Sequence, residues 1–72
     1  MKMEDTAKII GERIYLLRSR FGLSKKALAR DIGVDAATIR NWEMGKYYPN
    51  GYQLPRIADR FHCSIDYLFG RD

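Results

Sequence analysis

His62 and Cys63 stand side by side, and together they offer the imidazole and thiol chemistry that a nucleophilic or metal site would use. The chain has no other histidine or cysteine. Structural zinc takes four ligands, and a nucleophile needs both a base and an orienting residue, which this pair cannot supply. We therefore expect no enzyme activity, no metal and no other cofactor, and we interpret Cys63 as a small buried apolar residue.

A different chemistry is indicated by the segment 35–44, where Arg40 and Asn41 are neighbours. An asparagine amide can pair with the N6 and N7 edge of adenine, and an arginine can pair with guanine or bind a phosphate. If 35–44 is a helix with Ile39 and Trp42 turned inward, its outward side carries Ala36, Ala37, Arg40 and Asn41, with Thr38 beside them. The two alanines offer apolar contact only, so the longer hydrogen-bonding side chains on this side are those of Arg40 and Asn41.

The overall charge agrees with a polyanionic partner, although it fits a membrane surface equally well. The net charge is +4, with five basic and three acidic residues in each of the segments 1–23 and 24–50, and a balanced third segment. No stretch approaches the roughly 20 apolar residues of a membrane span, and the amino terminus lacks a signal-peptide core. We expect a cytoplasmic protein, and one cysteine agrees with a reducing compartment.

Three helices must position these side chains. Ile10, Ile14, Leu17 and Phe21 recur at helical spacing, which predicts a helix from Asp5 or Thr6 to Gly22. Ser24 and Asp35 are good N-caps for two short helices that end at Gly33 and Gly45. The second of these two helices contains the Arg40 and Asn41 pair.

A loop over 45–51 and two more helices complete the chain. We expect the loop to be an ordered surface segment, because it is rich in turn residues. Leu54, Ile57, Ala58 and Phe61 predict a fourth helix, which Pro55 places close to its start, and Ser64 caps a fifth that ends near Gly70. With 72 residues and no strand pattern, the sequence predicts one all-α, five-helix domain over 1–72.

The segment 24–44 predicts a helix-turn-helix, which lays one helix across the DNA backbone and places the next in the major groove. An ordinary helical hairpin is the alternative. Three features favour the helix-turn-helix: Ala29 is small where the two helices cross, Gly33 lies in the turn, and Ile39 returns to the core.

Nearly the whole chain, from Ile10 to Phe69, resembles the lambda-repressor/Cro-type helix-turn-helix family, also called the xenobiotic-response-element (XRE) family. The resemblance is carried by IGERIYLLRSRFGLS, LARDIGVDAATIRNWEMGK, the proline after the loop and IADRFHCSIDYLF. It implies a transcriptional regulator, in particular a repressor, that binds double-stranded DNA as a homodimer on a two-fold symmetric operator. It also implies an ion pair between Arg18 and Glu43, and it assigns DNA contacts to the following residues: Lys25, Ala36, Ala37, Thr38, Arg40, Asn41, Lys46 and Tyr47, with Tyr48 as a weaker candidate.

The chain departs from the family pattern at several of these positions. Lys25 replaces a common glutamine, so a phosphate contact is kept but the support that this glutamine gives to the first reading residue is not. Ala36 and Ala37 replace larger polar readers. His62 stands where a glycine usually ends the fourth helix, so we expect a strained cap there.

A protein-interaction module, such as an antitoxin or a bridging factor, is the competing function. It would present Ile9, Leu16 or Phe69 to another protein. Exposed apolar residues from Ile65 to Phe69 could equally form the interface of a dimer on DNA. Salt separates the two functions, because binding driven by phosphates weakens steeply in salt and apolar association does not.

Overall fold

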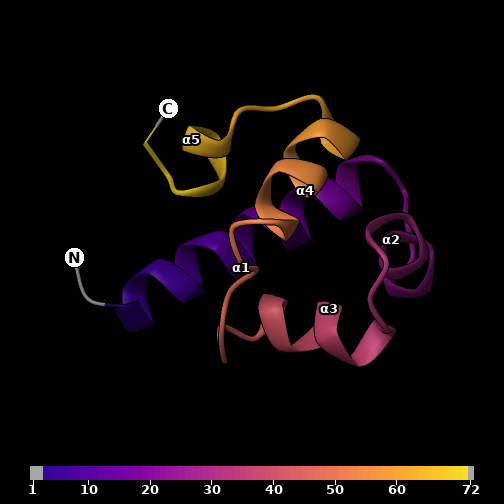
Figure 1. Ribbon diagram of the computed structural model, residues 1–72, viewed down its shortest axis with the longest axis horizontal. Helices are drawn as coiled ribbons and strands as arrows, with labels where there is room; N and C mark the ends of the chain where they lie inside the picture. Colours follow the sequence, from indigo (N-terminus) through magenta and orange to yellow (C-terminus); the bar gives the residue numbers. More distant parts are fainter. Residues whose placement is uncertain (1–2, 72) are drawn as a thin grey trace.

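The computed structural model describes residues 3–71, which form five α-helices and no strand (Figure 1). The helices are α1 (Met3–Arg20), α2 (Lys25–Ile32), α3 (Ala36–Glu43), α4 (Gln53–Phe61) and α5 (Ile65–Leu68). The predicted all-α fold with a helix-turn-helix is confirmed, and α2 and α3 are its two helices. Within the described range, no helix combines the length and apolar character needed to cross a membrane.

The bounds of α1 differ from the prediction at both ends. The helix begins at Met3 rather than at Asp5 or Thr6, in a stretch that contains no glycine or proline to stop it. It ends at Arg20, so Phe21 lies in the following turn and is 44% exposed. The prediction that Phe21 continues the buried face was wrong. Its ring covers the edge of the core from outside, with its centroid 5.0 Å from that of Phe61.

The predicted N-caps are all present. The side chains of Ser24, Asp35 and Ser64 each accept a hydrogen bond from the backbone N–H three residues later, at 3.0, 2.8 and 3.0 Å. Ahead of α4, Asn50 and Gln53 cap each other reciprocally: the Asn50 side chain accepts from Gln53 N, and the Gln53 side chain accepts from Asn50 N. Apart from the bond to Asn50 N, each of these bonds satisfies an amide in the first turn of a helix that the helix itself leaves free.

All five helices are followed by a residue with positive φ: Gly22, Gly33, Gly45, His62 and Gly70. This left-handed conformation lets the chain turn away and bond the last carbonyls of the helix. His62, at φ 55° and ψ 42°, is the one residue of the described chain other than glycine in this region. The expected strained cap of α4 is therefore present.

The core lies where α1 packs against α3 and α5, α2 against α3 and α4, and α4 against α5. Figure 1 shows α1 running behind the other helices, with α5 near its amino-terminal end and α2 near its carboxyl-terminal end. The fully buried residues at the centre are Ile10, Ile14, Leu28, Ile39, Trp42, Ile57 and Leu68. This arrangement gives α3 one buried side and leaves its other side open.

The loop between α3 and α4 is less superficial than the sequence predicts. Pro49 is fully buried, and Tyr48 packs against the core. Turn residues predicted a surface segment, but the rings of this proline and tyrosine fill space between helices. The second half of the loop therefore fixes the path of the chain into α4.

Candidate nucleic-acid interface

The inward side of α3 rests directly on α1. Ile39 and Trp42 are 0% and 1% exposed. Opposite them, Gly11 lies so close to the end of α3 that a Cβ atom there would overlap the Trp42 carbonyl oxygen and come within 3.2 Å of the Glu43 carbonyl oxygen. Backbone therefore meets backbone at this crossing, and only glycine fits. The sequence reasoning missed this contact, because a glycine inside a helix carries no sign of which helix it faces.

The predicted ion pair between Arg18 and Glu43 is present. Arg18 Nε donates to Glu43 Oε2 at 2.7 Å and Nη2 donates to Oε1 at 3.1 Å, while Nη1 donates to the Leu23 carbonyl at 2.9 Å. The side chains are 15% and 8% exposed. The hydrogen bonds to Glu43 raise the pKa of the Arg18 guanidinium above its ordinary value. The pair ties the end of α3 to α1 and to the start of the helix-turn-helix.

The outward side of α3 carries the predicted reading residues. Ala37 and Arg40 are exposed, and Ala36, Thr38 and Asn41 are half-buried. The Thr38 hydroxyl donates to Asp35 Oδ1 at 2.7 Å, so this side chain is engaged in capping the helix. Together with the Thr38 backbone N–H, the hydroxyl lowers the pKa of the Asp35 carboxyl. Arg40 and Asn41 are therefore the outward residues of α3 best suited to bond a base edge.

The loop after α3 returns to Asn41 in two ways. Lys46 N donates to the Asn41 carbonyl at 3.1 Å, as part of the turn at Gly45 that follows the end of α3. Asn41 Nδ2 donates to the Tyr47 hydroxyl, also at 3.1 Å. The structure thus brings together two predicted site residues, Asn41 and Tyr47, that the sequence placed in separate roles.

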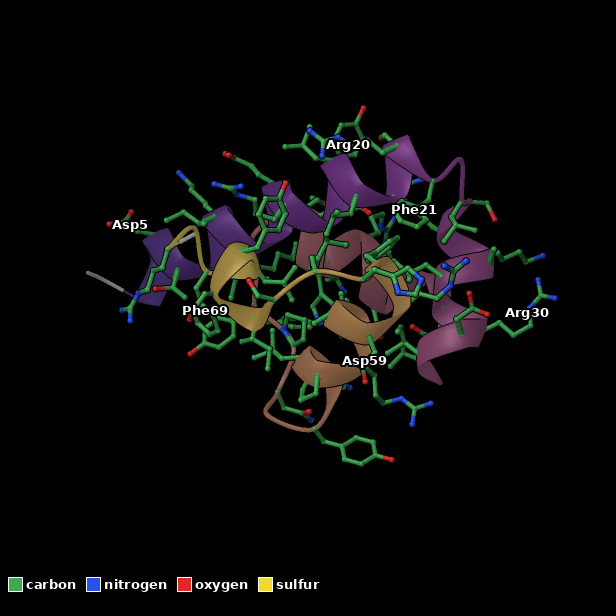
Figure 2. All side chains as sticks on the ribbon, turned by 90° about the horizontal axis from the view of Figure 1, so that it is seen from above. Asp5, Arg20, Phe21, Arg30, Asp59 and Phe69 are labelled. Atoms are coloured by element: carbon green, nitrogen blue, oxygen red, sulfur yellow. The ribbon has the colours of Figure 1, made fainter. Side chains whose placement is uncertain are left out.

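The predicted phosphate-binding lysines are free of the core. Lys25 is exposed at the first residue of α2, and Lys46 is exposed just after α3. In Figure 2, Arg20 and Arg30 also extend away from the body of the protein. Arg30 lies in the last turn of α2, so it adds positive charge to the helix-turn-helix itself.

His62 and Cys63 directly follow α4. His62 is exposed and Cys63 half-buried, so Cys63 is less enclosed than expected. Desolvation raises the pKa of the Cys63 thiol, which disfavours the nucleophilic thiolate. Across the described residues, no three histidine, cysteine or acidic side chains lie together as they would around a metal ion.

Part of the apolar surface predicted for a dimer or protein contact, from Ile65 to Phe69, packs into the core instead. Leu68 is fully buried and Phe69 packs against the core, which leaves Ile65 at 39% exposed. Of the other residues that a protein-interaction module would present, Ile9 is half-buried and Leu16 is 45% exposed. Figure 2 shows Phe69 on the side of the molecule where α5 lies over α1.

The chain is similar in sequence to known helix-turn-helix proteins. The family model described as "Helix-turn-helix domain" matches residues 11–71. The chain is 34% identical over 65 residues to Repressor protein C2 of Salmonella phage P22, covering 90% of this chain and 30% of the relative. It is 37% identical over 57 residues to an uncharacterised HTH-type transcriptional regulator of Archaeoglobus fulgidus, covering 79% of this chain and 81% of that protein.

Solved structures share the same arrangement of helices. The P22 c2 repressor, crystallised with a synthetic operator, is similar with a TM-score of 0.82 at 35% identity, over 88% of this chain and 96% of that chain. A regulator of the HTH_3 family from Vibrio cholerae gives 0.83 at 28% identity, over 99% of this chain and 40% of that chain. The chain spans 30% and 28% of the first two curated relatives, the P22 repressor and an Enterococcus faecalis transcriptional activator.

Proposed function

The chain belongs to the helix-turn-helix family of the lambda-repressor and XRE type, and from this premise we propose that it is a sequence-specific, double-stranded-DNA-binding transcriptional repressor. We place α3 in the major groove as the recognition helix and α2 across the backbone. The P22 repressor, whose structure was determined with operator DNA, supports this assignment through its similarity over most of both chains.

One observation carries the proposal: α3 is fixed on one side and open on the other. Its inner side is held by the close contact at Gly11 and by the pair of Arg18 and Glu43. Its outer side presents Arg40 and Asn41, whose side chains can discriminate between base pairs. A rigid helix with an exposed set of hydrogen-bonding groups is what reading of the major groove requires.

The proposed contacts divide into two kinds. Asn41 and Arg40 read base edges, with apolar contact from Ala36 and Ala37 to thymine methyl groups and Thr38 beside them. Lys25 and Lys46 hold the phosphate backbone and carry little sequence information, and Tyr47 adds a contact to the phosphate backbone. Direct readout then rests on few side chains, because the alanines cannot donate or accept hydrogen bonds.

We further propose that two copies bind a two-fold symmetric operator in the cytoplasm. An eight-residue α3 reaches only a few base pairs, so a second copy supplies the second half-site about one helical turn away. Within α5, Leu68 is buried and Ile65 is 39% exposed, so Ile65 is the apolar side chain of this helix that could contact a second copy. A nuclease footprint at saturating protein should cover two half-sites, and protection of one half-site would contradict the dimer.

Salt dependence tests the function against a protein-interaction role. Operators are first selected from random DNA with the purified chain, and affinity is then measured by gel shift in rising salt. Affinity for DNA should fall steeply, in proportion to the number of phosphates contacted. Selection that yields no enriched sequence would overturn the proposal.

The division of roles is tested on a panel of single-base operator variants. Asn41→Ala should flatten preference at one position of each half-site, with a loss of about 1 to 3 kcal/mol of discrimination. Lys25→Ala should weaken all sequences alike and lower the salt slope by about one unit per monomer. The opposite pattern, in which the lysine change alters base preference and the asparagine change does not, would reverse the assignment.

A further inference from the structure

The hydrogen bond between Asn41 and Tyr47 joins the proposed base reader to a residue outside its helix. Asn41 Nδ2 lies 3.1 Å from Tyr47 Oη, and the Asn41 carbonyl accepts from Lys46 N, also at 3.1 Å. Asn41 is half-buried, and Tyr47 is 46% exposed. The backbone of Asn41 is therefore held through its carbonyl, and its side chain is held through its terminal amide.

A primary amide has two N–H groups and one carbonyl oxygen, so a single bond to Tyr47 does not exhaust it. One N–H donates to the hydroxyl, and the second N–H and Oδ1 remain available for a base edge. Without the hydroxyl, the amide of an outward asparagine rotates among several orientations, and binding must select one of them. Fixing a side chain before it binds reduces the entropy lost on binding.

Resting on the function proposed above, we propose that Tyr47 is a positioning residue: its hydroxyl orients the Asn41 amide for base reading. Tyr47 thus contributes to sequence specificity without contacting a base. The hydroxyl that accepts from Asn41 still has its own proton, which it can donate to a phosphate oxygen. Contact with the DNA backbone and recognition of a base are then linked through the side chains of Tyr47 and Asn41.

This role differs measurably from a simple phosphate contact. A hydroxyl that only binds a phosphate adds the same affinity on every sequence, whether or not residue 41 is asparagine. A hydroxyl that orients Asn41 changes base preference, and it does so only while the asparagine is present. The two effects separate in a double-mutant cycle, because residues that act together are not additive.

The test combines Tyr47→Phe, Asn41→Ala and the double variant on the operator panel. Tyr47→Phe should reduce discrimination about threefold to tenfold at the position that Asn41 reads. In the Asn41→Ala background, the same change should leave discrimination unaltered. Tyr52→Phe is the matched control, because Tyr52 is 73% exposed near the same loop and its hydroxyl lies 3.4 Å from Arg56 Nη1. It should leave base preference unchanged.

A second measurement needs no DNA. In the free protein, the side-chain amide resonances of Asn41 should show slowed hydrogen exchange, which Tyr47→Phe removes while the backbone spectrum and the melting curve are retained. Equal effects of Tyr47→Phe on all sequences, independent of residue 41, would overturn the positioning role and leave the proposed function intact. Absence of any selective DNA binding by the unmodified chain would overturn the proposed function, and the positioning role with it.

Discussion

Helices α3 and α4 are of similar length and adjoin the same loop, yet they are held in different ways. α3 is fixed by close, directional contacts: a glycine crossing at Gly11, the pair of Arg18 and Glu43, and the Asp35 cap. α4 is held by a broad apolar face, with an exposed ion pair between Arg60 and Asp31 and a strained end at His62. The tightest geometric constraints therefore act on the helix that we propose reads DNA.

The strongest way to break this contrast is to add one methyl group beneath α3. Gly11→Ala should lower the free energy of unfolding by about 3 kcal/mol, because the new Cβ meets the Trp42 backbone and α1 and α3 must separate. At an unconstrained helix position the same change would stabilise by about 1 kcal/mol. Urea denaturation followed by circular dichroism measures the difference.

Gly51→Ala is the control for this change. A Cβ at Gly51 would have no neighbour within 4 Å, and the residue is not among those with positive φ. Its substitution should be neutral or stabilise by up to about 1 kcal/mol. Equal effects at both glycines would refute the close crossing of α1 and α3.

The second prediction compares the two ion pairs. Glu43→Ala should cost about 2 kcal/mol, because it leaves the largely enclosed Arg18 guanidinium without its carboxylate. Asp31→Ala should cost under about 1 kcal/mol, because the side chains of the Arg60 and Asp31 pair are 33% and 39% exposed. Denaturant melts of both variants measure the costs, and similar values would mean that α3 and α4 are tied equally firmly.

The third prediction concerns the strained end of α4. His62→Gly should raise the free energy of unfolding by about 1 kcal/mol, because glycine adopts the left-handed conformation without a Cβ penalty. His62→Ala keeps the Cβ atom and should show no such gain. If alanine stabilises as much as glycine, the imidazole rather than the backbone is the cause.

The smallest effect is the pH dependence of the α3 cap. Because the pKa of Asp35 is lowered in the folded chain, mainly by the hydroxyl and backbone N–H of Thr38, the carboxylate contributes stability above its unfolded pKa of about 3.9. This contribution is lost as the pH falls through that value and then through the folded pKa. Asp35→Asn keeps a capping oxygen but does not titrate. The stability advantage of the natural chain over this variant should shrink in melts at acid pH. A constant difference would contradict a contribution of the carboxylate charge to the cap.

The sequence by itself determined the five helices and the buried and open sides of α3. Ser24, Asp35 and Ser64 act through bonds to amides three residues away, and the spacing of Ile39 and Trp42 decides the buried side of α3. Capping and periodicity are local, so they can be predicted from neighbouring residues. The same locality gave the outward set around Arg40 and Asn41, while the DNA-contact roles and the pair of Arg18 and Glu43 came from the resemblance to a family.

Only the tertiary structure decided which elements meet and where. The crossing at Gly11, the burial of Pro49, the exposure of Phe21 and the bond from Asn41 to Tyr47 depend on the relative placement of segments. Helix crossing points and loop paths are set by packing of the whole core, so no spacing along the chain encodes them. The side chains available for reading DNA are thus fixed by sequence, and the support that orients them by the packed fold.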